Sequence, residues 1–525
     1  MNTIYKLVWN TSRRTWVVVG ELSKSRKKSS RKLLVSSVIG STVLLSAASA
    51  FADAPSGTQT ITLNGDGSNY QLTQPSNLDA TAEGHDGLDA FHIQTTAGSD
   101  ASLNKISVGN HVEISGGKGS NGSNGSYGQR GSNGSNGGNN IRGQNLTINV
   151  NSNGVIQGGN GGNGGNGGNG GNGGNGGNGG NAISGEHLII INSGKIWGGA
   201  GGNGGNKGSG GNPGNDGNRG AAVLFTGGDN SLTMNDGSEI KGDIVIDSTT
   251  SGGSGNSLSV TSNISDTSKS TVNGSLTVGE NTSVSFSGNK VTFSGDSDFG
   301  NNSSLMLNGD SGLATQGAIS FGDTAKVNIN NVITDWTQNS YDLLDAGNGI
   351  NGLTADNISV TSPLLVDGAQ DYTHVTLSTN KLSYGLSWNT QDGSAHGEFA
   401  LRDGATLTLH TVLADNTGTT HTSGWDGKSL TKSGGGELIL ATQNTYTGTT
   451  TINGGTLKTA TDDAIAGTSG VNIAENGTLN LNGHNQTLTD IDNSGTVLIN
   501  DTGAAPLTTP VTVTGNMTLR QSGLV

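Results

Sequence analysis

The chain has 525 residues, including 92 glycines, 6 prolines and no cysteine, and its formal net charge is −14. A hydrophobic fraction of 30% is too low for several conventional cores, and the lack of cysteine excludes disulfides, a thiol nucleophile and Cys-ligated zinc. Proline and charge are too scarce for a collagen-like or a disordered chain, so we expect stability to come from regular backbone pairing.

The first 52 residues are typical of a secretory signal. A basic block at 24–32 precedes an apolar run at 33–48, which is shorter than the roughly 20 residues that span a bilayer. Ala50 and Ala52 supply the small side chains that a signal peptidase recognises. We therefore predict cleavage between Ala52 and Asp53.

Removal of this signal leaves a strongly acidic chain. Residues 1–52 hold nine of the 26 Lys and Arg residues but only one of the 40 Asp and Glu residues. The remaining surface repels phosphate backbones and anionic lipid. No nucleic-acid partner is therefore expected.

Three glycine-rich inserts follow, within residues 111–225. Each has glycine at every third position, eight times in succession, over 116–137, 158–179 and 199–220. Ile-x-Gly-Gly units at Ile114, Ile156 and Ile196 precede them at spacings of 42 and 40 residues, and Ile240 follows 44 residues later without an insert. We predict that each unit is one coil of about 20 residues carrying an insert of similar length.

Two structures fit such an insert. A flexible surface loop is favoured by the glycine content, whereas an extended helix with three residues per turn is favoured by the period, because glycine then lines one edge. Pro213 is the only proline in the inserts, which argues against a collagen trimer. An extended pass of about 24 residues would end about 75 Å from its start. Hairpins of two arms would allow each insert to return to the next coil. We hypothesise that six such arms pack side by side above three adjacent coils, and the flexible loop stays open as the alternative.

From about residue 225 onward, short alternating runs predict strands, for example at Ser257–Val260, Ser283–Phe286 and Thr406–Leu409. Near the C-terminus, similar Gly-Thr-Leu-like units begin at residues 455, 477, 495 and 515, which are 22, 18 and 20 residues apart. A period of about 20 residues with two or three short strands predicts a β-solenoid. No amphipathic helix of four turns is expected after Ala52.

Two segments resemble parts of a known family. Residues 1–24, with Val-Trp-Asn at 8–10 and Glu-Leu at 21–22, resemble the extended signal peptide region of type V secreted proteins. Residues 430–457, with Asn-Thr-Tyr-Thr-Gly at 444–448, resemble the passenger-associated transport repeat of autotransporters. The resemblance implies an all-β fold, namely the right-handed parallel β-helix passenger of an adhesin-type autotransporter.

This interpretation divides the chain into five parts. They are an extended signal peptide at 1–52, a cap and first coils at 53–110, coils with three inserts at 111–225, further β-helix at 226–429, and transport repeats at 430–525. The chain ends within a repeat, without the translocator barrel that the family resemblance implies. We therefore expect a truncated passenger.

Candidate catalytic and metal-binding residues are weak. Gly-Asp-Ser-Gly at 309–312 matches the nucleophile turn of chymotrypsin-type proteases but fits a coil corner better. The histidines without a familiar catalytic context are His85, His92, His111 and His187. The acids weighed as calcium ligands, and judged better as solvated turn residues, are Asp79, Glu83, Asp86 and Asp89. We predict no catalytic, cofactor-binding or metal-binding residue, and no enzyme activity.

The sequence predicts export by the Sec translocon of a Gram-negative bacterium, followed by cleavage by signal peptidase. With a translocator, which the family carries in cis, we expect the cell surface or outer membrane; without one, the periplasm. The expected function is adhesion, aggregation or biofilm formation, through a host-surface or self-association partner that the sequence does not identify. The alternatives are a secreted polysaccharide lyase or serine protease on a β-helix, or an inactive periplasmic remnant.

Overall fold

The computed structural model describes residues 5–10, 15–20, 57–74, 78–79, 84–95, 100–247, 255–260, 271–417, 421, 424–500 and 511–520. Two compact units are present, Met1–Thr42 and Val43–Val525. In the first, β1 (Tyr5–Asn10) pairs antiparallel with β2 (Thr15–Gly20). The predicted cleavage residues Ala50, Ala52 and Asp53 lie outside the described residues.

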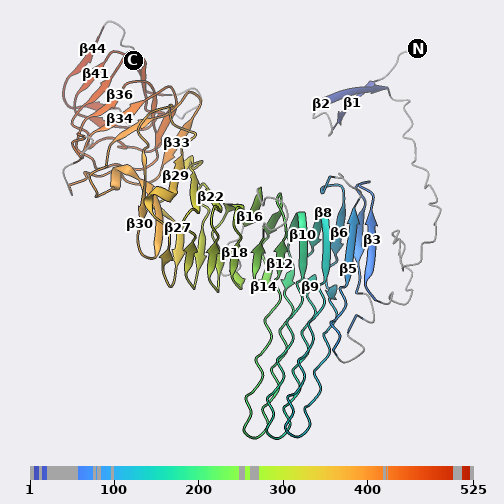
Figure 1. Cartoon of the computed structure of the whole chain (residues 1–525). Coiled ribbons are helices and arrows are strands. Elements are labelled where there is room, and N and C mark those ends of the chain that lie inside the picture. The colour runs from blue at the N-terminus through green and yellow to red at the C-terminus, as the bar shows by residue number, and fades with distance from the viewer. Residues whose placement is uncertain are drawn as a thin grey trace. The chain divides into compact units, whose positions relative to one another are not determined.

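The second unit is a parallel β-helix, as predicted, whose coils place strands on three faces (Figure 1). Its first face comprises β3 (Gln59–Leu63), β5 (Phe91–Thr95), β8 (Ile141–Val150), β10 (Ile183–Asn192), β12 (Val223–Phe225), β15 (Ile244–Ile246), β18 (Leu276–Val278), β21 (Ser297–Phe299), β24 (Ile319–Phe321) and β28 (Ile350–Asn351). The ten-residue strands β8 and β10 continue from the first face onto the second.

The other two faces are built in the same way. The second comprises β4 (Asn69–Leu72), β6 (Lys105–Val108), parts of β8 and β10, β13 (Ser231–Met234), β16 (Asn256–Val260), β19 (Ser283–Gly288), β22 (Ser304–Asn308), β25 (Lys326–Asn330) and β29 (Ile358–Thr361). The third comprises β7 (Glu113–Ser115), β9 (Val155–Gln157), β11 (Lys195–Trp197), β14 (Glu239–Lys241), β17 (Thr271–Asn273), β20 (Val291–Phe293), β23 (Leu313–Thr315) and β27 (Ser340–Ala346).

Buried and more exposed side chains alternate along each strand, and the buried ones form a thin core. In β19 the side chains alternate between half-buried serine and buried Val284 and Phe286. Phe286 pairs in register with Leu258 of the preceding coil and Leu307 of the next, and all three side chains are at most 1% exposed. On the third face the predicted isoleucine repeat is confirmed, because Ile114, Ile156, Ile196 and Ile240 pair in register, one per coil. Stacked columns of this kind let a weakly hydrophobic chain fold.

The parallel array is interrupted after β29, which the repeat pattern did not reveal. Here β30 (Thr373–Leu377) and β31 (Lys381–Leu386) form a hairpin that pairs antiparallel with β27 and ends the third face. Large aromatic side chains fill the interior: the ring centroids of Trp336 and Tyr341 lie 5.2 Å apart, and those of Trp336 and Tyr384 lie 5.7 Å apart.

Two further parallel sheets form the C-terminal coils. One contains β26 (Asp335–Trp336), β33 (Thr406–Leu409), β35 (Glu437–Leu440), β37 (Gly455–Thr459), β39 (Gly477–Asn480) and β42 (Thr496–Leu498). The other contains β32 (Glu398–Ala400), β34 (Leu430–Ser433), β36 (Thr450–Ile452), β38 (Val471–Ile473), β41 (Ile491–Asn493) and β44 (Met517–Leu519), and a short pair joins β40 (Thr487–Leu488) to β43 (Thr512–Val513).

The predicted C-terminal repeat is correct for three of its four units. Gly455 pairs with Gly477, and Leu479 with Val497, as equivalent positions of successive coils. The fourth unit, at residue 515, was wrong: Met517 pairs with Ile491 in the other sheet. The Gly-x-apolar pattern misled because both sheets place an apolar residue shortly after a coil corner, although Met517 itself is 43% exposed.

Helix is confined to short 3₁₀ turns, η2 (Ala355–Asn357) and η3 (Ser387–Asn389), over the residues placed by the structure, in agreement with the expectation of no long helix. No helix in that part of the chain is long and apolar enough to cross a membrane.

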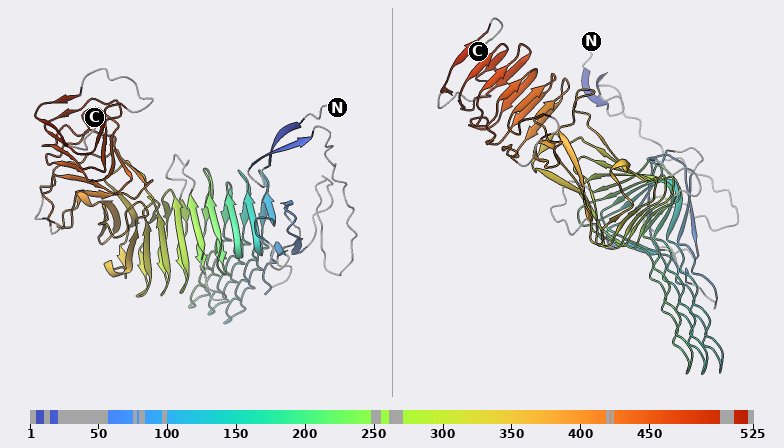
Figure 2. Two further views of the ribbon diagram at one scale, coloured as in Figure 1. Left: turned by 90° about the horizontal axis from the view of Figure 1, so that it is seen from above. Right: turned by 60° about the vertical axis from the view of Figure 1, so that its left-hand side comes forward.

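The three inserts are hairpins that leave the β-helix at one corner, between a third-face strand and the next first-face strand. Hairpin A covers 116–140, hairpin B 158–182 and hairpin C 198–222, and their tips lie at Gly128, Gly170 and Gly210, which have positive φ. Their wavy arms hang side by side below the coils (Figure 1; Figure 2).

Backbone hydrogen bonds join the six arms into one bundle, hereafter the glycine bundle. Between hairpins B and C, Gly161 N–H donates to Ala200 O at 2.8 Å, and the same bond recurs every third residue. Gly162 N–H donates to Ser135 O of hairpin A, also at 2.8 Å. Of the two structures considered from the sequence, the bundle of hairpins is the one present, and the flexible loop is wrong.

Candidate functional site

The number of glycines per triplet follows each arm's position in the bundle. Hairpin B repeats Gly-Gly-Asn, and both glycines are needed, because a Cβ at Gly161 would lie 2.0 Å from Gly177 O and one at Gly162 would lie 1.8 Å from Ser120 O. Hairpin A, at one edge, repeats Gly-Ser-Asn over much of its length. In the returning arm of hairpin C, at the other edge, Pro213, Asp216 and Arg219 stand where hairpin B has glycine.

The third residue of each triplet, asparagine, joins neighbouring hairpins through its side chain. Asn121 Oδ1 accepts the backbone N–H of Asn163 at 2.9 Å, and Asn163 Oδ1 accepts that of Asn203 at 3.0 Å. Further rows repeat this arrangement on both broad faces of the bundle, and most of these side chains are exposed. The bundle therefore presents rows of ordered carboxamides.

Aspartates begin some of these rows at the base of hairpin A. Asp86 Oδ1 accepts the N–H of Asn136 at 2.7 Å, Asp89 Oδ1 that of Asn139 at 2.7 Å, and Asp79 Oδ1 that of Lys118 at 2.8 Å. These acids were predicted to be solvated turn residues. Asp79 and Asp86 are exposed, and all three carboxylates also cap the bundle edge. Glu83 lies outside the described residues, and among those described there is no group of three or more metal-ligating side chains.

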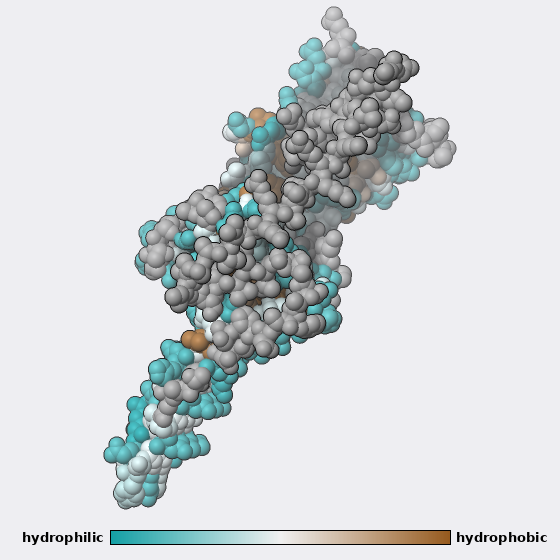
Figure 3. Space-filling model, turned by 90° about the vertical axis from the view of Figure 1, so that its right-hand side faces the viewer, coloured by the Kyte–Doolittle hydropathy of each residue, from teal (hydrophilic) through white to brown (hydrophobic). Residues whose placement is uncertain are grey.

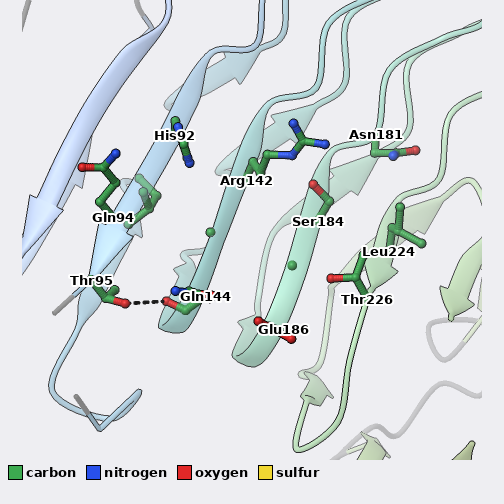
Figure 4. Close-up of a pocket in the computed structure, with 13 residues that line it drawn as sticks. His92, Gln94, Thr95, Arg142, Gln144, Asn181, Ser184, Glu186, Leu224 and Thr226 are labelled. Atoms are coloured by element: carbon green, nitrogen blue, oxygen red, sulfur yellow. Dashed lines mark hydrogen bonds between the residues drawn. The ribbon is translucent and has the colours of Figure 1, made fainter. Parts of the chain in front are cut away.

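A groove of about 550 Å³ lies on the first face, beside the base of the bundle (Figure 4). One side carries His92, Arg142 and Ser184, which occupy equivalent positions on the successive strands β5, β8 and β10. The other carries Gln94, Gln144 and Glu186. Polar side chains of three coils thus line one continuous depression.

Aligned glycines lie between these two rows. Gly143 and Gly185 pair with each other, whereas the next strand has Phe225 at the equivalent position. Next to them, Ser184 is only 4% exposed, and its Oγ has no hydrogen-bond partner among the described residues. Because an unpaired buried hydroxyl costs free energy, this Oγ is a ready partner for a ligand hydroxyl, amide or carboxylate.

The groove lacks the geometry for nucleophilic catalysis. His92 and Ser184 lie on strands separated by β8, so their backbones are about 10 Å apart, beyond hydrogen-bond reach. The side chain of Arg142 is 61% exposed, and its guanidinium lies 3.9 Å from the carboxylate of Asp89. These groups are suited to hydrogen-bonding a polar ligand.

The protease-like turn at 309–312 is a buried coil corner. The side chain of Ser311 is 0% exposed; its Oγ donates to Phe286 O at 3.0 Å and accepts Asn308 N–H at 2.9 Å. A hydroxyl engaged in this way cannot attack a substrate. The coil-corner interpretation of this motif is therefore confirmed.

A Ser–His pair that the sequence did not suggest occurs at the interruption. Ser387 Oγ lies 3.0 Å from His396 Nε2, which lies 2.7 Å from Asp371 O. Glu398 N–H donates to Nδ1 of the same ring, which places the remaining proton on Nε2, so this nitrogen cannot accept a proton from Ser387. Burial lowers the pKa of His396 and keeps the ring neutral. The pair is structural.

The remaining histidines are dispersed. His111 lies in a turn with φ of 59°, and His187 lies within β10 with φ of 51°. His187 Nε2 lies 3.9 Å from Asp229. His85 contributes its carbonyl oxygen, which accepts Ser120 N–H at the base of the bundle. Of the four histidines considered from sequence, only His92 lines the groove.

Comparisons with known protein families give three matches. Residues 1–50 match the extended signal peptide of the type V secretion system, and residues 430–458 match the passenger-associated transport repeat. Residues 326–387 match the VirG insertion domain, and this segment includes the antiparallel hairpin of β30 and β31. No curated protein matches the chain.

The matched segments lie at the N-terminus, at the interruption and in the C-terminal coils. The first indicates Sec-dependent export across the inner membrane. Together with the parallel β-helix, the three matches indicate that this chain is a type V autotransporter passenger region.

Proposed function

We propose that this passenger region is a non-enzymatic adhesive protein that acts at the cell surface. The glycine bundle is the observation that carries the proposal. It encloses no apolar core, and its exposed asparagine side chains are held by hydrogen bonds to the neighbouring hairpin. Such an element adds contact surface without contributing to the stacked core of the β-helix.

The groove on the first face also supports an adhesive function, although less directly than the bundle. It combines side-chain amides, Arg142 and the unpaired Ser184 hydroxyl, which favour recognition of a polar ligand over its conversion. Neither the groove nor the Ser387–His396 pair offers a nucleophile with an available base.

Removal of the bundle tests the proposal, and a coil that carries no hairpin shows which short connection can replace one. At the coil without an insert, Gly242-Asp243 alone joins β14 to β15. The same dipeptide would replace residues 116–140, 158–182 and 198–222, and the variant would be displayed through a type V translocator fused to its C-terminus. We expect normal surface levels by antibody labelling, with loss of cell aggregation and adherence.

The matched control is Asp243→Asn, which changes no hairpin. Unaltered aggregation and adherence of the hairpin-free variant, at equal surface display, would show that the bundle is not the adhesive element.

A further inference from the structure

Twelve asparagine side chains of hairpins A and B share one orientation. Each Oδ1 accepts a backbone N–H of the next hairpin at 2.8–3.1 Å, so the Nδ2 end of each carboxamide faces away from that bond. Within the described chain none of these Nδ2 groups donates a hydrogen bond. They are Asn121, Asn124, Asn133, Asn136, Asn139, Asn160, Asn163, Asn166, Asn172, Asn175, Asn178 and Asn181.

The result is a regular array of hydrogen-bond donors. Asparagines recur every third residue along an arm, which corresponds to about 9 Å in a three-residue extended helix. The bundle surface is hydrophilic, in teal and white (Figure 3). Because each side chain is already held by its Oδ1, little rotamer freedom remains to be lost when a ligand binds.

The charge of the bundle is opposite to that of the whole chain. Its hairpins contain four cationic residues, Lys118, Arg130, Lys207 and Arg219, against the single acid Asp216, in a chain with a net charge of −14. All four cationic side chains are exposed. The bundle is thus a cationic, donor-rich element on an acidic protein.

The outer part of the bundle lies too far from the acidic coils for their charge to repel an anion bound there. Ten residues of an arm extend about 30 Å, whereas the Debye length at physiological ionic strength is about 8 Å. Arg130 and Lys207 lie near the tips, where Tyr127 is 83% exposed. An anionic ligand can therefore approach the outer bundle with little opposition from the acidic coils.

We propose that the asparagine rows of the glycine bundle bind a linear acidic polysaccharide. Its carboxylates and hydroxyls accept from the outward Nδ2 groups, and its negative charge pairs with the cationic residues. A repeating polymer suits a repeating array, whereas a lipid surface would require exposed apolar anchors, and Tyr127 is the only large aromatic side chain of the three hairpins. This inference rests on the adhesive function proposed above and names its ligand class.

Asparagine-to-aspartate changes test it with little effect on the fold. In N163D/N166D, each carboxylate can still accept the N–H of Asn203 or Asn206, as Asp86 and Asp89 do for hairpin A. The outward donors, however, become acceptors with negative charge. The matched control N351D/N472D adds the same charge at exposed positions of the coils.

Binding of the purified passenger to immobilised polygalacturonate would be measured by biolayer interferometry, with neutral dextran as comparator. We expect wild type and N351D/N472D to bind polygalacturonate alike and in a salt-sensitive way, and dextran weakly. N163D/N166D should bind polygalacturonate about tenfold more weakly, for the loss of two donors and the gain of two repulsive charges. Unchanged hydrogen-exchange protection of Gly202 and Gly205 would verify that the bundle is intact.

Equal binding of N163D/N166D and wild type, equal affinity for dextran, or no binding to either polymer would overturn the inference. Any of these results together with loss of aggregation in the hairpin-free variant would leave the adhesive function standing with another ligand. Unaltered aggregation of that variant, together with selective polygalacturonate binding, would instead remove the adhesive function and retain the binding site.

Discussion

The coils and the glycine bundle both stack parallel backbones, but different interactions hold them together. In the coils, columns such as Leu258, Phe286 and Leu307 bury apolar side chains, at about 25 cal/mol per Å² of apolar surface removed from water. In the bundle, glycine backbones approach so closely that no side chain fits, and dense hydrogen bonds replace apolar burial.

The bundle depends on the coils for its alignment. Each hydrogen bond in it adds about 0.5–1.5 kcal/mol net, which alone does little to order a glycine-rich chain. The pairing of Ile156 with Ile196 at the base of hairpins B and C fixes the register before the arms begin. The comparison teaches that a hydrophobic stack can hold in place a structure that has no hydrophobic core.

The largest expected effect concerns the coils. Phe286→Ala leaves a cavity between Leu258 and Leu307 and should lower the free energy of unfolding by about 3–5 kcal/mol, measured by chemical denaturation. The neighbouring change Ser287→Ala, on the outer side of the same strand, should alter it by less than about 0.5 kcal/mol. Similar losses for both would show that the coils do not depend on apolar columns.

A smaller loss is expected from one methyl group inside the bundle. In Gly173→Ala the Cβ would lie 2.0 Å from Gly205 O, so hairpin C must move, at a cost of about 1–3 kcal/mol. Hydrogen exchange at Gly205 and Gly214 should accelerate. At the equivalent edge position of hairpin C, Pro213→Ala should leave these amides protected; equal acceleration there would contradict the assignment of inner and edge arms.

A pH effect is expected in the C-terminal coils. Lys432 is fully buried, its Nζ donates to the carbonyl oxygens of Ser433, Gly434 and Gly454, and burial lowers its pKa to about 8. Between pH 8 and the ordinary lysine pKa near 10.5, the unfolded chain binds more protons than the folded one, so stability rises with pH, by at most about 1.4 kcal/mol per unit.

Chemical denaturation at pH 7, 8.5 and 9.5 would measure this rise, and Lys432→Met should flatten it. If the free energy of unfolding depends on pH in the same way for wild type and Lys432→Met, Lys432 is not the origin of that dependence.

The smallest effect concerns a single carboxamide row. Asn178→Ala removes the acceptor of Asn218 N–H, which lies 2.9 Å from Oδ1, at an exposed position, and should cost about 0.5–1 kcal/mol. Asn178→Asp keeps the acceptor and should retain the exchange protection of Asn218. Loss of protection in both variants would mean that the side-chain rows do not stabilise the bundle.

The fold could be predicted from the sequence wherever a period was visible. The three-residue glycine period and the need to return to the next coil gave the hairpins, and the spacing of Ile114, Ile156, Ile196 and Ile240 gave the coils. Both patterns are local and repeat several times. The unit at residue 515 failed because one repeat alone does not distinguish two sheets with the same alternation.

The groove and the antiparallel interruption could not be predicted in this way. The groove depends on Gly143 and Gly185 lying side by side, which requires the register across an insert of about 25 residues. The aromatic residues Trp336, Tyr341, Tyr372 and Tyr384, clustered in an otherwise aromatic-poor chain, were the available signal for the interruption. At the base of hairpin A, the backbone N–H groups of Gly87 and Ala90 donate to the carbonyl oxygens of Asn136 and Asn139. These donors come from a segment without a repeat, so the sequence pattern did not indicate them.

The two edges of the bundle differ from its middle, and this makes the bundle modular. Hairpin B presents to hairpin C the same glycines and asparagines that hairpin A presents to it, whereas the outer edges end in Asp86 and Asp89 on one side and in Pro213 on the other. An in-frame tandem duplication of 158–197 would therefore insert a coil and a hairpin that find matching neighbours on both sides. The width of the array can change in single genetic steps while its ends remain closed to edge-to-edge polymerisation.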